Sequence, residues 1–554
     1  MSDPRRRAAR LLSGLGLVLG VAIVTAAVLG VAPWSHESAL GPPHLIEQAE
    51  AAGIDHRYAG DFPYVVGGGV AVFDCNDDGR QELYLAGGAD PAALYRNDSR
   101  VGGELRFSQL PSPVTDLTEV TGAYPLDIDG DGLTDLAVLR IGPKVLLRGL
   151  GNCAFEKANA DWGLDGGSVW TTAFSATWEA SASWPTLAFG NYRNEASNDL
   201  AHLCYDNELV RPNGAQDGFA AGVPLTPSWC ALSMLFSDWD RSGRRDLRVS
   251  NDRHYYRQPG GEEQLWRMEA GRQPRLWTVA EGWQPIQVWG MGIASQDLTG
   301  DGFPEIYLTS QGANKLQTLT NGSAEPRYED IAVDRGVDGT HPFVGDVDLP
   351  STAWHSEFQD VNNDGLMDLF VSKGNVEEQP DYAMRDPSDL FIGQADGTFL
   401  EGAEAAGIVS FSRARGAALA DLNLDGLLDL IVVNRRENVK LWRSVGNGTA
   451  DEPEPMGNWL ALDLGEAGPN RNAIGAWIEV RVGDRTIWRE VTVGGGHAGG
   501  QLGWIHLGLG VAGTADVTIH WPDGEAGPTM ALDANQFYEL KRGAIEASPW
   551  TPGA

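Results

Sequence analysis

The sequence has few basic residues for its length. Its 554 residues include 41 Lys and Arg against 76 Asp and Glu, which gives a formal net charge of -35. Such a surface repels the phosphates of nucleic acids and anionic lipid headgroups, so we expect no nucleic-acid partner. Motifs for common active sites are also missing: the sequence has no G-x-S-x-G, no phosphate-binding loop, no dinucleotide-binding turn and no zinc-ligand spacing. These absences argue against the corresponding enzyme classes.

Cysteine is scarce, with four residues in the whole chain: Cys75, Cys153, Cys204 and Cys230. An even count permits two disulfides in three connectivities. We favour a bond between Cys204 and Cys230, because they lie close together within one irregular region. The alternative is that some of the four are free, buried thiols.

The N-terminus carries the one long apolar run. Arg5, Arg6, Arg7 and Arg10 precede an uncharged stretch from 11 to 34. This run is long enough to span a bilayer, and its basic flank is expected to stay in the cytoplasm. We therefore predict a signal anchor over 1–35, with the rest of the chain membrane-anchored and facing the periplasm or extracellular space. The alternative is a secreted protein whose signal has been cleaved.

Glycine and proline are abundant, with 70 Gly and 30 Pro, which favours a β-rich chain with many tight turns. Six of these turns share one pattern, here called the acidic loops. Each is nine residues long, with Asp at position 1, oxygen-bearing side chains at positions 3 and 5, Gly at position 6 and an acid at position 9, and an apolar run follows. The predicted metal ligands are Asp74, Asn76, Asp78, Glu82; Asp127, Asp129, Asp131, Asp135; Asp238, Asp240, Ser242, Asp246; Asp297, Thr299, Asp301, Glu305; Asp360, Asn362, Asp364, Asp368; and Asp421, Asn423, Asp425, Asp429.

This spacing suits calcium, which takes six to eight oxygen ligands from alternate side chains, a backbone carbonyl and a closing carboxylate. The Gly at position 6 supplies the sharp turn. A single loop of this kind could be a metal-free Asx turn. Because six copies share one register, we predict up to six Ca²⁺ ions, with the loops of Ser242 and Thr299 as the weakest sites.

The loops recur about every 60 residues, with one gap of twice that length in which a degenerate copy lies at 190–194. Repeats of this size with several short strands each are typical of β-propeller blades. We predict an all-β fold: a seven-bladed β-propeller over 36–446, followed by a small β-sandwich. The segment 44–54 resembles 401–408 and is left over at the start of the chain, so we expect it to supply the outer strand of the seventh blade.

The remaining segments follow from composition and periodicity. Residues 447–457 are rich in Gly, Asp, Glu and Pro and are predicted to be a linker. Residues 458–542 alternate apolar and polar positions over short runs, which predicts the β-sandwich. Residues 543–554 are predicted to be a tail.

The motifs carry a family resemblance. The stretches 49–55 and 67–74 and the acidic loops resemble FG-GAP/VCBS repeats, as in integrin α-chain propellers and the cartilage acidic protein group. The stretches 472–476, 489–491, 494–497, 506–510 and 521–524 resemble the ASPIC/UnbV domain. The resemblance implies an exported, calcium-binding, seven-bladed propeller with a binding or assembly role. The chain departs from the family in its third blade, which lacks the acidic loop, and around 498–501, where the usual Ser-Gln is replaced.

Two groups of side chains allow a second interpretation. His341, His355, His497 and His506 could be catalytic, although isolated histidines more often satisfy core hydrogen bonds. Tryptophans 170, 178, 184 and 229 could form an aromatic binding surface or pack in the core. We expect a non-enzymatic module that binds a protein or glycan partner, as an accessory subunit of a membrane or cell-surface complex. The alternative is an enzyme that acts on a polysaccharide or secreted metabolite in the propeller funnel.

Overall fold

The computed structural model describes residues 39–553 except 180–181, 198–202, 254–259, 321, 323 and 346–347. Regular structure in these residues is almost entirely β, which confirms the predicted class; the short helical elements are η2 (Val279–Glu281), α2 (Ala332–Arg335) and α3 (Ala403–Ala406). The predicted anchor over 1–35 lies outside the described residues. Within the described part of the chain, no helix is long and apolar enough to cross a membrane.

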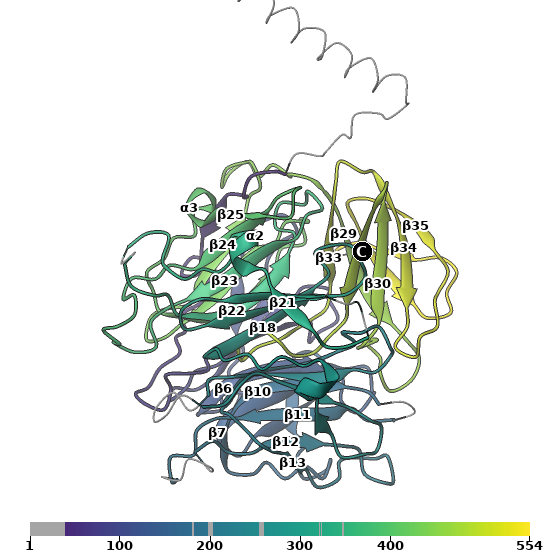
Figure 1. Cartoon of the computed structure of the whole chain (residues 1–554). Coiled ribbons are helices and arrows are strands. Elements are labelled where there is room, and N and C mark those ends of the chain that lie inside the picture. Colours follow the sequence, from purple (N-terminus) through teal and green to yellow (C-terminus); the bar gives the residue numbers. More distant parts are fainter. Residues whose placement is uncertain are drawn as a thin grey trace, which may run out of the picture. The chain divides into compact units, whose positions relative to one another are not determined.

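Strands that follow one another along the chain pair antiparallel into consecutive sheets (Figure 1). These sheets are β2 (Val70–Phe73), β3 (Glu82–Leu85), β4 (Ala93–Asn97) and β5 (Phe107–Gln109); β6 (Val120–Leu126), β7 (Asp135–Gly142), β8 (Val145–Gly149) and β9 (Phe155–Lys157); β10 (Val169–Thr177), β11 (Thr186–Asn191), β12 (Asn207–Val210) and β13 (Val223–Leu225); β14 (Ala231–Ser237), β15 (Asp246–Asn251), β16 (Gln264–Arg267) and β17 (Arg275–Leu276); β18 (Gly290–Gln296), β19 (Glu305–Ser310), β20 (Lys315–Leu319) and β21 (Tyr328–Asp330); β22 (Ala353–Gln359), β23 (Asp368–Lys373), β24 (Asp389–Gly393) and β25 (Phe399–Glu401); and β26 (Ala414–Ala420), β27 (Asp429–Asn434) and β28 (Lys440–Ser444).

The first strands of these sheets form a closed ring. Each contacts the first strand of the next sheet, from β2 through β6, β10, β14, β18 and β22 to β26, and β26 contacts β2 again. These strands pack on both faces, and β2, β6, β14 and β26 are buried along their whole length. Such strands need continuous apolar or small residues, as in the Val-Ala-Val-Phe of β2. The arrangement is that of a β-propeller.

The last sheet of the ring is completed from the other end of the chain. Strand β1 (Leu45–Glu47) pairs antiparallel with β28, with Leu45 opposite Ser444 and Glu47 opposite Trp442. Leu45 is 6 % exposed and packs among the apolar residues of this sheet and its neighbour. The N-terminal strand therefore covers the edge that β28 would otherwise present.

The C-terminal residues form two further sheets. One contains β33 (Ile505–Gly510), β29 (Asn458–Gly465), β36 (Gln536–Lys541) and β37 (Ser548–Trp550), and the other β31 (Arg485–Glu490), β30 (Trp477–Val482), β34 (Thr514–His520) and β35 (Met530–Asp533). Alternate residues of both, such as Leu460, Leu462, Ile478 and Val480, share one apolar core. This is a sandwich. Strand β37 lies in the predicted tail, so the paired structure extends past residue 542.

A glycine-rich stretch of the C-terminal region, here called the axial segment (residues 493–502), runs through the propeller ring. It forms bridges or strand pairs with β2, β6, β10, β14 and β18. Its end, β32 (Gln501–Leu502), pairs parallel with β2. A Cβ on Gly69 or Gly122 would lie 1.7 or 1.9 Å from the carbonyl oxygen of Ala498. Glycine is therefore required where the ring meets this segment.

Candidate metal centres

Each acidic loop connects the first and second strands of its sheet and has the same internal geometry. The Gly at position 6 has φ between 80 and 91° in all of them, the left-handed region that the sequence pattern predicts. Its N–H donates to the Asp at position 1 over 2.6 to 3.0 Å: Gly79 to Asp74, Gly132 to Asp127, Gly243 to Asp238, Gly302 to Asp297, Gly365 to Asp360 and Gly426 to Asp421.

The closing acid at position 9 folds back onto the start of its loop. One of its oxygens accepts the backbone N–H of position 2 over 2.7 to 3.0 Å: Glu82 from Cys75, Asp135 from Ile128, Glu305 from Leu298, Asp368 from Val361 and Asp429 from Leu422. The acid at position 5 accepts the N–H two residues later: Asp78 from Arg80, Asp131 from Leu133, Asp301 from Phe303, Asp364 from Leu366 and Asp425 from Leu427. The acids at positions 1, 5 and 9 of these loops are thus each held by backbone N–H groups of their own loop.

The loop at 127–135 holds its acids closest together. Asp127, Asp129 and Asp135 each place one carboxylate oxygen within 4.8 Å of the others. The Arg148 guanidinium forms ion pairs with Asp129 at 2.9 Å and Asp131 at 3.1 Å from one side. Three converging carboxylates balanced by one arginine leave excess negative charge, which suits a divalent cation.

Burial changes the proton affinity of the closing acids. Removal from water raises the pKa of Glu82 and of Asp135 to about 8 each, and that of Glu305 to about 7, with smaller contributions from neighbouring carboxylates. Burial likewise raises the pKa of Asp127 and Asp425 to about 6. Without a cation, Glu82 and Asp135 therefore hold protons at neutral pH, whereas Asp127 and Asp425 take them up only in mild acid. A divalent ion bound by the same oxygens would take the place of those protons.

The loop at 421–429 gives a separate indication that a ligand belongs there. Asn423 at position 3 is 1 % exposed, and its side-chain nitrogen donates to Gly103 O and to Asp425. Its Oδ1 is buried and has no hydrogen-bond partner among the described residues. A buried acceptor of this kind is costly, and a cation would satisfy it. The donor set of Asp421, Asn423, Asp425 and Asp429 therefore fits calcium.

The loop at 238–246 is different, because a basic side chain already lies between its carboxylates. The Arg244 guanidinium donates to Asp246 at 2.8 Å and to Asp240 at 3.0 Å. Asp246 also accepts the indole N–H groups of Trp239 and Trp277 at 3.0 and 2.9 Å. Sequence reasoning missed Arg244, although it follows the loop glycine directly. Arg80 holds the same position in the first loop, but it pairs with Asp78 alone.

The loops of Ser242 and Thr299 contain the two hydroxyl side chains among the predicted ligands. Ser242 Oγ accepts the Arg244 N–H at 3.4 Å, and Thr299 Oγ1 lies 3.5 Å from Asp297. Both hydroxyls therefore contact their own loops.

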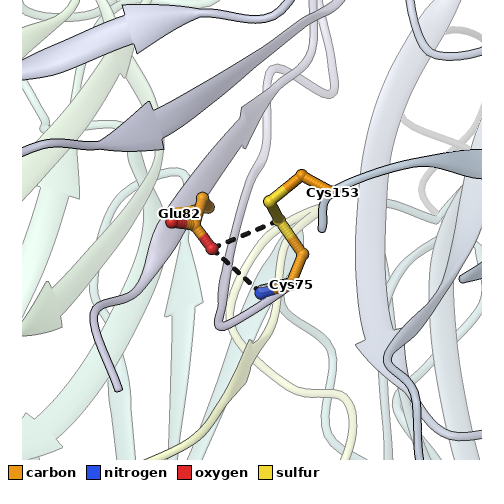
Figure 2. Close-up of side chains that lie close together, drawn as sticks. All are labelled: Cys75, Glu82 and Cys153. Atoms are coloured by element: carbon orange, nitrogen blue, oxygen red, sulfur yellow. Dashed lines mark hydrogen bonds between the residues drawn. A yellow bond between two sulfur atoms is a disulfide. The ribbon is translucent and has the colours of Figure 1, made fainter. Parts of the chain in front are cut away.

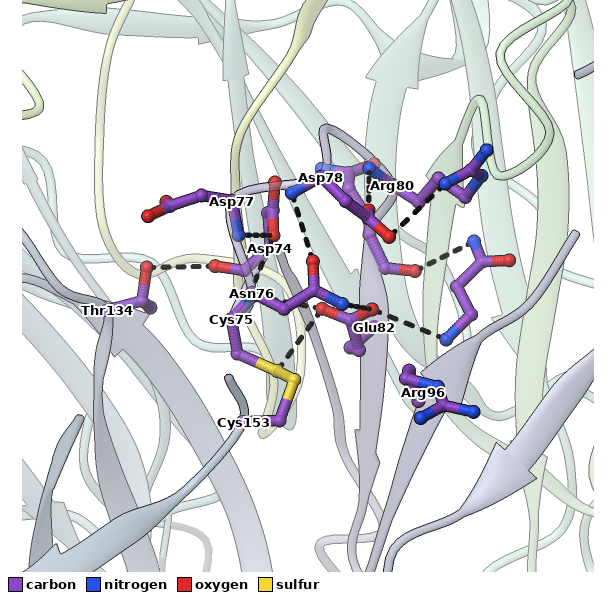
Figure 3. Close-up of a disulfide and its surroundings, with 12 residues drawn as sticks. Asp74, Cys75, Asn76, Asp77, Asp78, Arg80, Glu82, Arg96, Thr134 and Cys153 are labelled. Atoms are coloured by element: carbon purple, nitrogen blue, oxygen red, sulfur yellow. Dashed lines mark hydrogen bonds and ion pairs between the residues drawn. A yellow bond between two sulfur atoms is a disulfide. The ribbon is translucent and has the colours of Figure 1, made fainter. Parts of the chain in front are cut away.

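Glu82, Cys75 and Cys153 form a close cluster beside the first loop (Figure 2). The two cysteines are joined as a disulfide, so the cluster has no thiolate to bind a metal. The bond ties the loop after β2 to the turn between β8 and β9 in the next sheet (Figure 3). The predicted bond between Cys204 and Cys230 is confirmed.

Six of the eight side chains in the two alternative groups are buried, whereas His341 is exposed and Trp229 is half-buried. His497 is fully buried in the axial segment; its Nε2 accepts the Gly67 N–H at 3.2 Å, so its Nδ1 carries the proton and donates to Met291 O at 3.2 Å. Tryptophans 170, 178 and 184 are 3, 7 and 7 % exposed. Both ring nitrogens of His497 are occupied, and these indoles pack in the core and form no exposed surface.

Comparisons with known proteins agree with the motif analysis. Residues 465–547 match the ASPIC and UnbV family, and residues 74–138 and 360–432 match the FG-GAP-like repeat. No curated protein matches the chain. Similar solved structures include BBS1N in complex with ARL6DN (11 % identity, TM-score 0.41, 74 % of this chain and 99 % of that one). Another is an Agrocybe aegerita lectin that recognises non-reducing terminal N-acetylglucosamine (16 % identity, TM-score 0.39, 65 % of this chain and 86 % of that one). A third is the Dos1 propeller (10 % identity, TM-score 0.31, 75 % of this chain and 97 % of that one).

Proposed function

Because the chain carries FG-GAP-like repeats and an ASPIC and UnbV domain, we propose that it is a calcium-stabilised, seven-bladed propeller that acts outside the cytoplasm as a binding or assembly module. Its partner is a protein or a glycan. The segment 1–35 anchors it to a membrane, where it serves as an accessory subunit of a membrane or cell-surface complex.

The acidic loops carry the calcium part of this proposal. The observation with the most weight is the buried, unpartnered Oδ1 of Asn423 within a set of three carboxylates. Calcium would be held by the side chains at positions 1, 3, 5 and 9 of each loop, where it would neutralise their charge and join the two ends of the turn. The loop at 238–246 is the exception, since Arg244 already neutralises Asp240 and Asp246.

The cysteines support a location outside the cytoplasm. All four are paired in disulfides, Cys75 with Cys153 and Cys204 with Cys230. Disulfides persist in oxidising compartments and are rare where glutathione keeps thiols reduced. The basic residues before the apolar run at 11–34 are consistent with the same orientation.

The filled axis favours binding over catalysis in the funnel. The axial segment contacts the first strands of five sheets, so it takes up space along the ring axis where a polymer such as a polysaccharide would have to pass. One observation favours the alternative of an enzyme for a secreted metabolite: His355 and Glu357 line a cavity beside the axis, with 3.5 Å between His355 Nε2 and the Glu357 carboxylate.

Affinity capture from detergent-solubilised native membranes tests the proposal. With calcium present, we expect the full-length chain to retain a defined partner, and excess chelator to release it. The Asp421→Asn/Asp429→Asn variant should retain less partner than wild type. Arg272→Gln is the control and should retain as much as wild type, because the Arg272 side chain is 77 % exposed and lies outside the acidic loops. Identical capture with and without calcium would contradict the proposal.

A further inference from the structure

The acidic loops of the propeller contact the C-terminal sandwich. In each of the six, a residue at the tip of the loop or the residue directly before the loop touches the sandwich. The pairs are Trp504 with Gly79, Arg471 with Gly130, Trp477 and Trp488 with Arg241, Trp488 with Gln296, His506 with Asn363, and Trp459 with Leu424. The loops predicted to bind calcium therefore also form the surface on which the sandwich lies.

Position 4 of each acidic loop has a left-handed backbone. At this position φ lies between 55 and 76° in all six loops. Glycine adopts this conformation freely, but only Gly130 and Gly300 supply it. Arg241 and Leu424 are residue types for which a left-handed backbone is unfavourable. Their conformation must therefore be held by groups on either side of the loop tip.

The side chains at position 4 fit the sandwich residues that they face. The guanidinium carbon of Arg241 lies 4.0 and 4.3 Å from the ring centroids of Trp477 and Trp488, an arrangement that favours a cation between two indoles. Leu424 is 3 % exposed and packs with Trp459 in one apolar cluster. Position 4 is not a predicted ligand position, so its side chain is available for contact with the sandwich.

The predicted metal ligands hold position 4 from the other side. In three loops its N–H donates to the carboxylate at position 1: Asp77 to Asp74 at 2.8 Å, Gly130 to Asp127 at 2.8 Å and Gly300 to Asp297 at 2.7 Å. In the loop at 421–429, Leu424 lies between two predicted ligands, Asn423 and Asp425, and the buried Asn423 Oδ1 lacks a hydrogen-bond partner among the described residues. A cation held by these groups would fix the loop tip that the sandwich contacts.

The same sandwich carries the axial segment. Residues 493–502 connect β31 to β33, so both ends of the segment are fixed in the sandwich. Within the ring, the Gly495 N–H donates to Met234 O and the Gly496 N–H to Ile293 O, each at 2.7 Å. A short connection of this kind can keep these hydrogen bonds only while the sandwich stays against the acidic loops.

We propose that the acidic loops form a calcium-dependent docking surface for the C-terminal sandwich, and that loss of the ions releases the sandwich and withdraws the axial segment from the ring. Position 4 gives the contact its specificity, and the ligand positions make it depend on calcium. The loop at 238–246, which Arg244 already neutralises, would keep its contact and act as a tether. This inference rests on the calcium part of the proposed function and extends it from stability to a change in conformation.

Hydrogen–deuterium exchange on the full-length protein tests the proposal, with calcium binding measured in parallel by isothermal titration calorimetry. Excess chelator should raise exchange in the axial segment at least about tenfold, the factor that one site contributes when calcium is about tenfold above its dissociation constant. Strand β11 is the internal reference, because it is buried and its sheet lacks an acidic loop; its exchange should rise less than about threefold.

The two measurements separate the possible failures. Calcium binding with unchanged exchange in the axial segment would overturn this inference and leave the proposed function standing. Equal increases in the axial segment and in β11 would show general loosening of the fold and would also overturn it. A protein that binds no calcium would contradict both this inference and the calcium part of the proposed function.

Variants of one loop test the role of position 4. With calcium present, Leu424→Ala should raise exchange in the axial segment without a change in calcium stoichiometry, whereas Asp425→Asn should raise it and lower the stoichiometry by one ion. The double variant should exceed the larger single effect only slightly, because both changes act on one contact. Glu404→Gln, which removes an exposed acid outside the acidic loops, is the control and should behave as wild type. Wild-type exchange in Leu424→Ala, with its fold verified by circular dichroism, or fully additive effects would refute the coupling.

Discussion

Arg244 Nε lies 2.8 Å from Asp246 Oδ1, and the same guanidinium reaches Asp240 at 3.0 Å. The Arg244 guanidinium therefore places a permanent positive charge between two of the predicted metal ligands of this loop. The acidic loops do not share this feature as a group. Because the Asp246 side chain is buried and that of Arg244 is 27 % exposed, the contact is stronger than a fully exposed ion pair. The loop at 238–246 is thus built to keep its shape without an added cation.

Removal of Arg244 should convert this loop into one that depends on calcium. We expect Arg244→Gln to lower the free energy of unfolding by about 1–3 kcal/mol, since it leaves Asp246 without its ion pair. Added calcium should restore part of the loss. Thermal unfolding of the variant at several calcium concentrations measures both effects. Arg80→Gln is the control and should cost less, because Arg80 pairs only with Asp78; equal losses in the two variants would contradict this interpretation.

Chelation should destabilise the whole propeller. If a site had a dissociation constant near 0.1 mM, about 1 mM calcium would add roughly 1.4 kcal/mol per site. Several such sites together approach the stability of an ordinary domain. We expect excess chelator to lower the melting temperature by many degrees in differential scanning calorimetry. An unchanged melting curve would show that the loops fold without an ion.

The contact of β1 with β28 should stabilise sheets far away in sequence. Leu45 is 6 % exposed, so we expect Leu45→Ala to cost about 2–4 kcal/mol through the lost apolar contacts and the cavity. The control is Val511→Ala, whose side chain is 82 % exposed and should cost almost nothing. Urea unfolding monitored by circular dichroism gives both values. Deletion of residues 44–54 should destabilise the protein further, and a truncated chain that unfolds no more easily would argue against closure of the ring by this strand.

The disulfide between Cys75 and Cys153 should stabilise the folded protein mainly by lowering the conformational entropy of the unfolded chain. The two cysteines are 78 residues apart, a loop for which closure entropy predicts about 4.5 kcal/mol. The double variant Cys75→Ala/Cys153→Ala should therefore unfold at a clearly lower denaturant concentration than wild type under oxidising conditions. The two should become equal once both proteins are reduced, because reduction also breaks the bond between Cys204 and Cys230. A variant as stable as the oxidised wild type would refute the expected contribution.

His497 should make stability fall in mild acid. Burial lowers its pKa to about 3 from the ordinary value of 6.5, so on acidification the unfolded chain takes up this proton before the folded protein does. Stability is then lost as the pH falls below 6.5, by up to about 1.4 kcal/mol per pH unit from this one group. His497→Gln should flatten the dependence between pH 7 and pH 5 in urea titrations. Parallel curves for variant and wild type would exclude the effect.

Local patterns revealed much of this fold in advance. The positions of the acidic loops, the left-handed glycine at position 6 and the disulfide between Cys204 and Cys230 depend on residues close together in the sequence, and each could be predicted. The bond between Cys75 and Cys153 joins neighbouring sheets, so its spacing carries no signal. Arg244 was visible as a basic residue after a loop glycine, but its effect depends on rotamer and burial.

The axial segment could not be predicted from its own residues. Gly494 and Gly496 look like a flexible turn in isolation, yet they pair with Leu235 and Ile293 in the propeller. The signal lay in Gly69 and Gly122, whose missing side chains leave room for the Ala498 carbonyl. Only the three-dimensional arrangement brings these distant glycines together, because each belongs to a different sheet.

The pairing of Leu45 with Ser444 also constrains how the protein can be made. A ribosome synthesises β1 first and its partner β28 only after every other strand of the ring. Through that interval β1 has no native neighbour and the growing sheets have an open edge. The ring therefore closes as a late, long-range event, and a chain arrested before residue 444 is a partly folded protein with strand edges available to aggregate or to bind a chaperone.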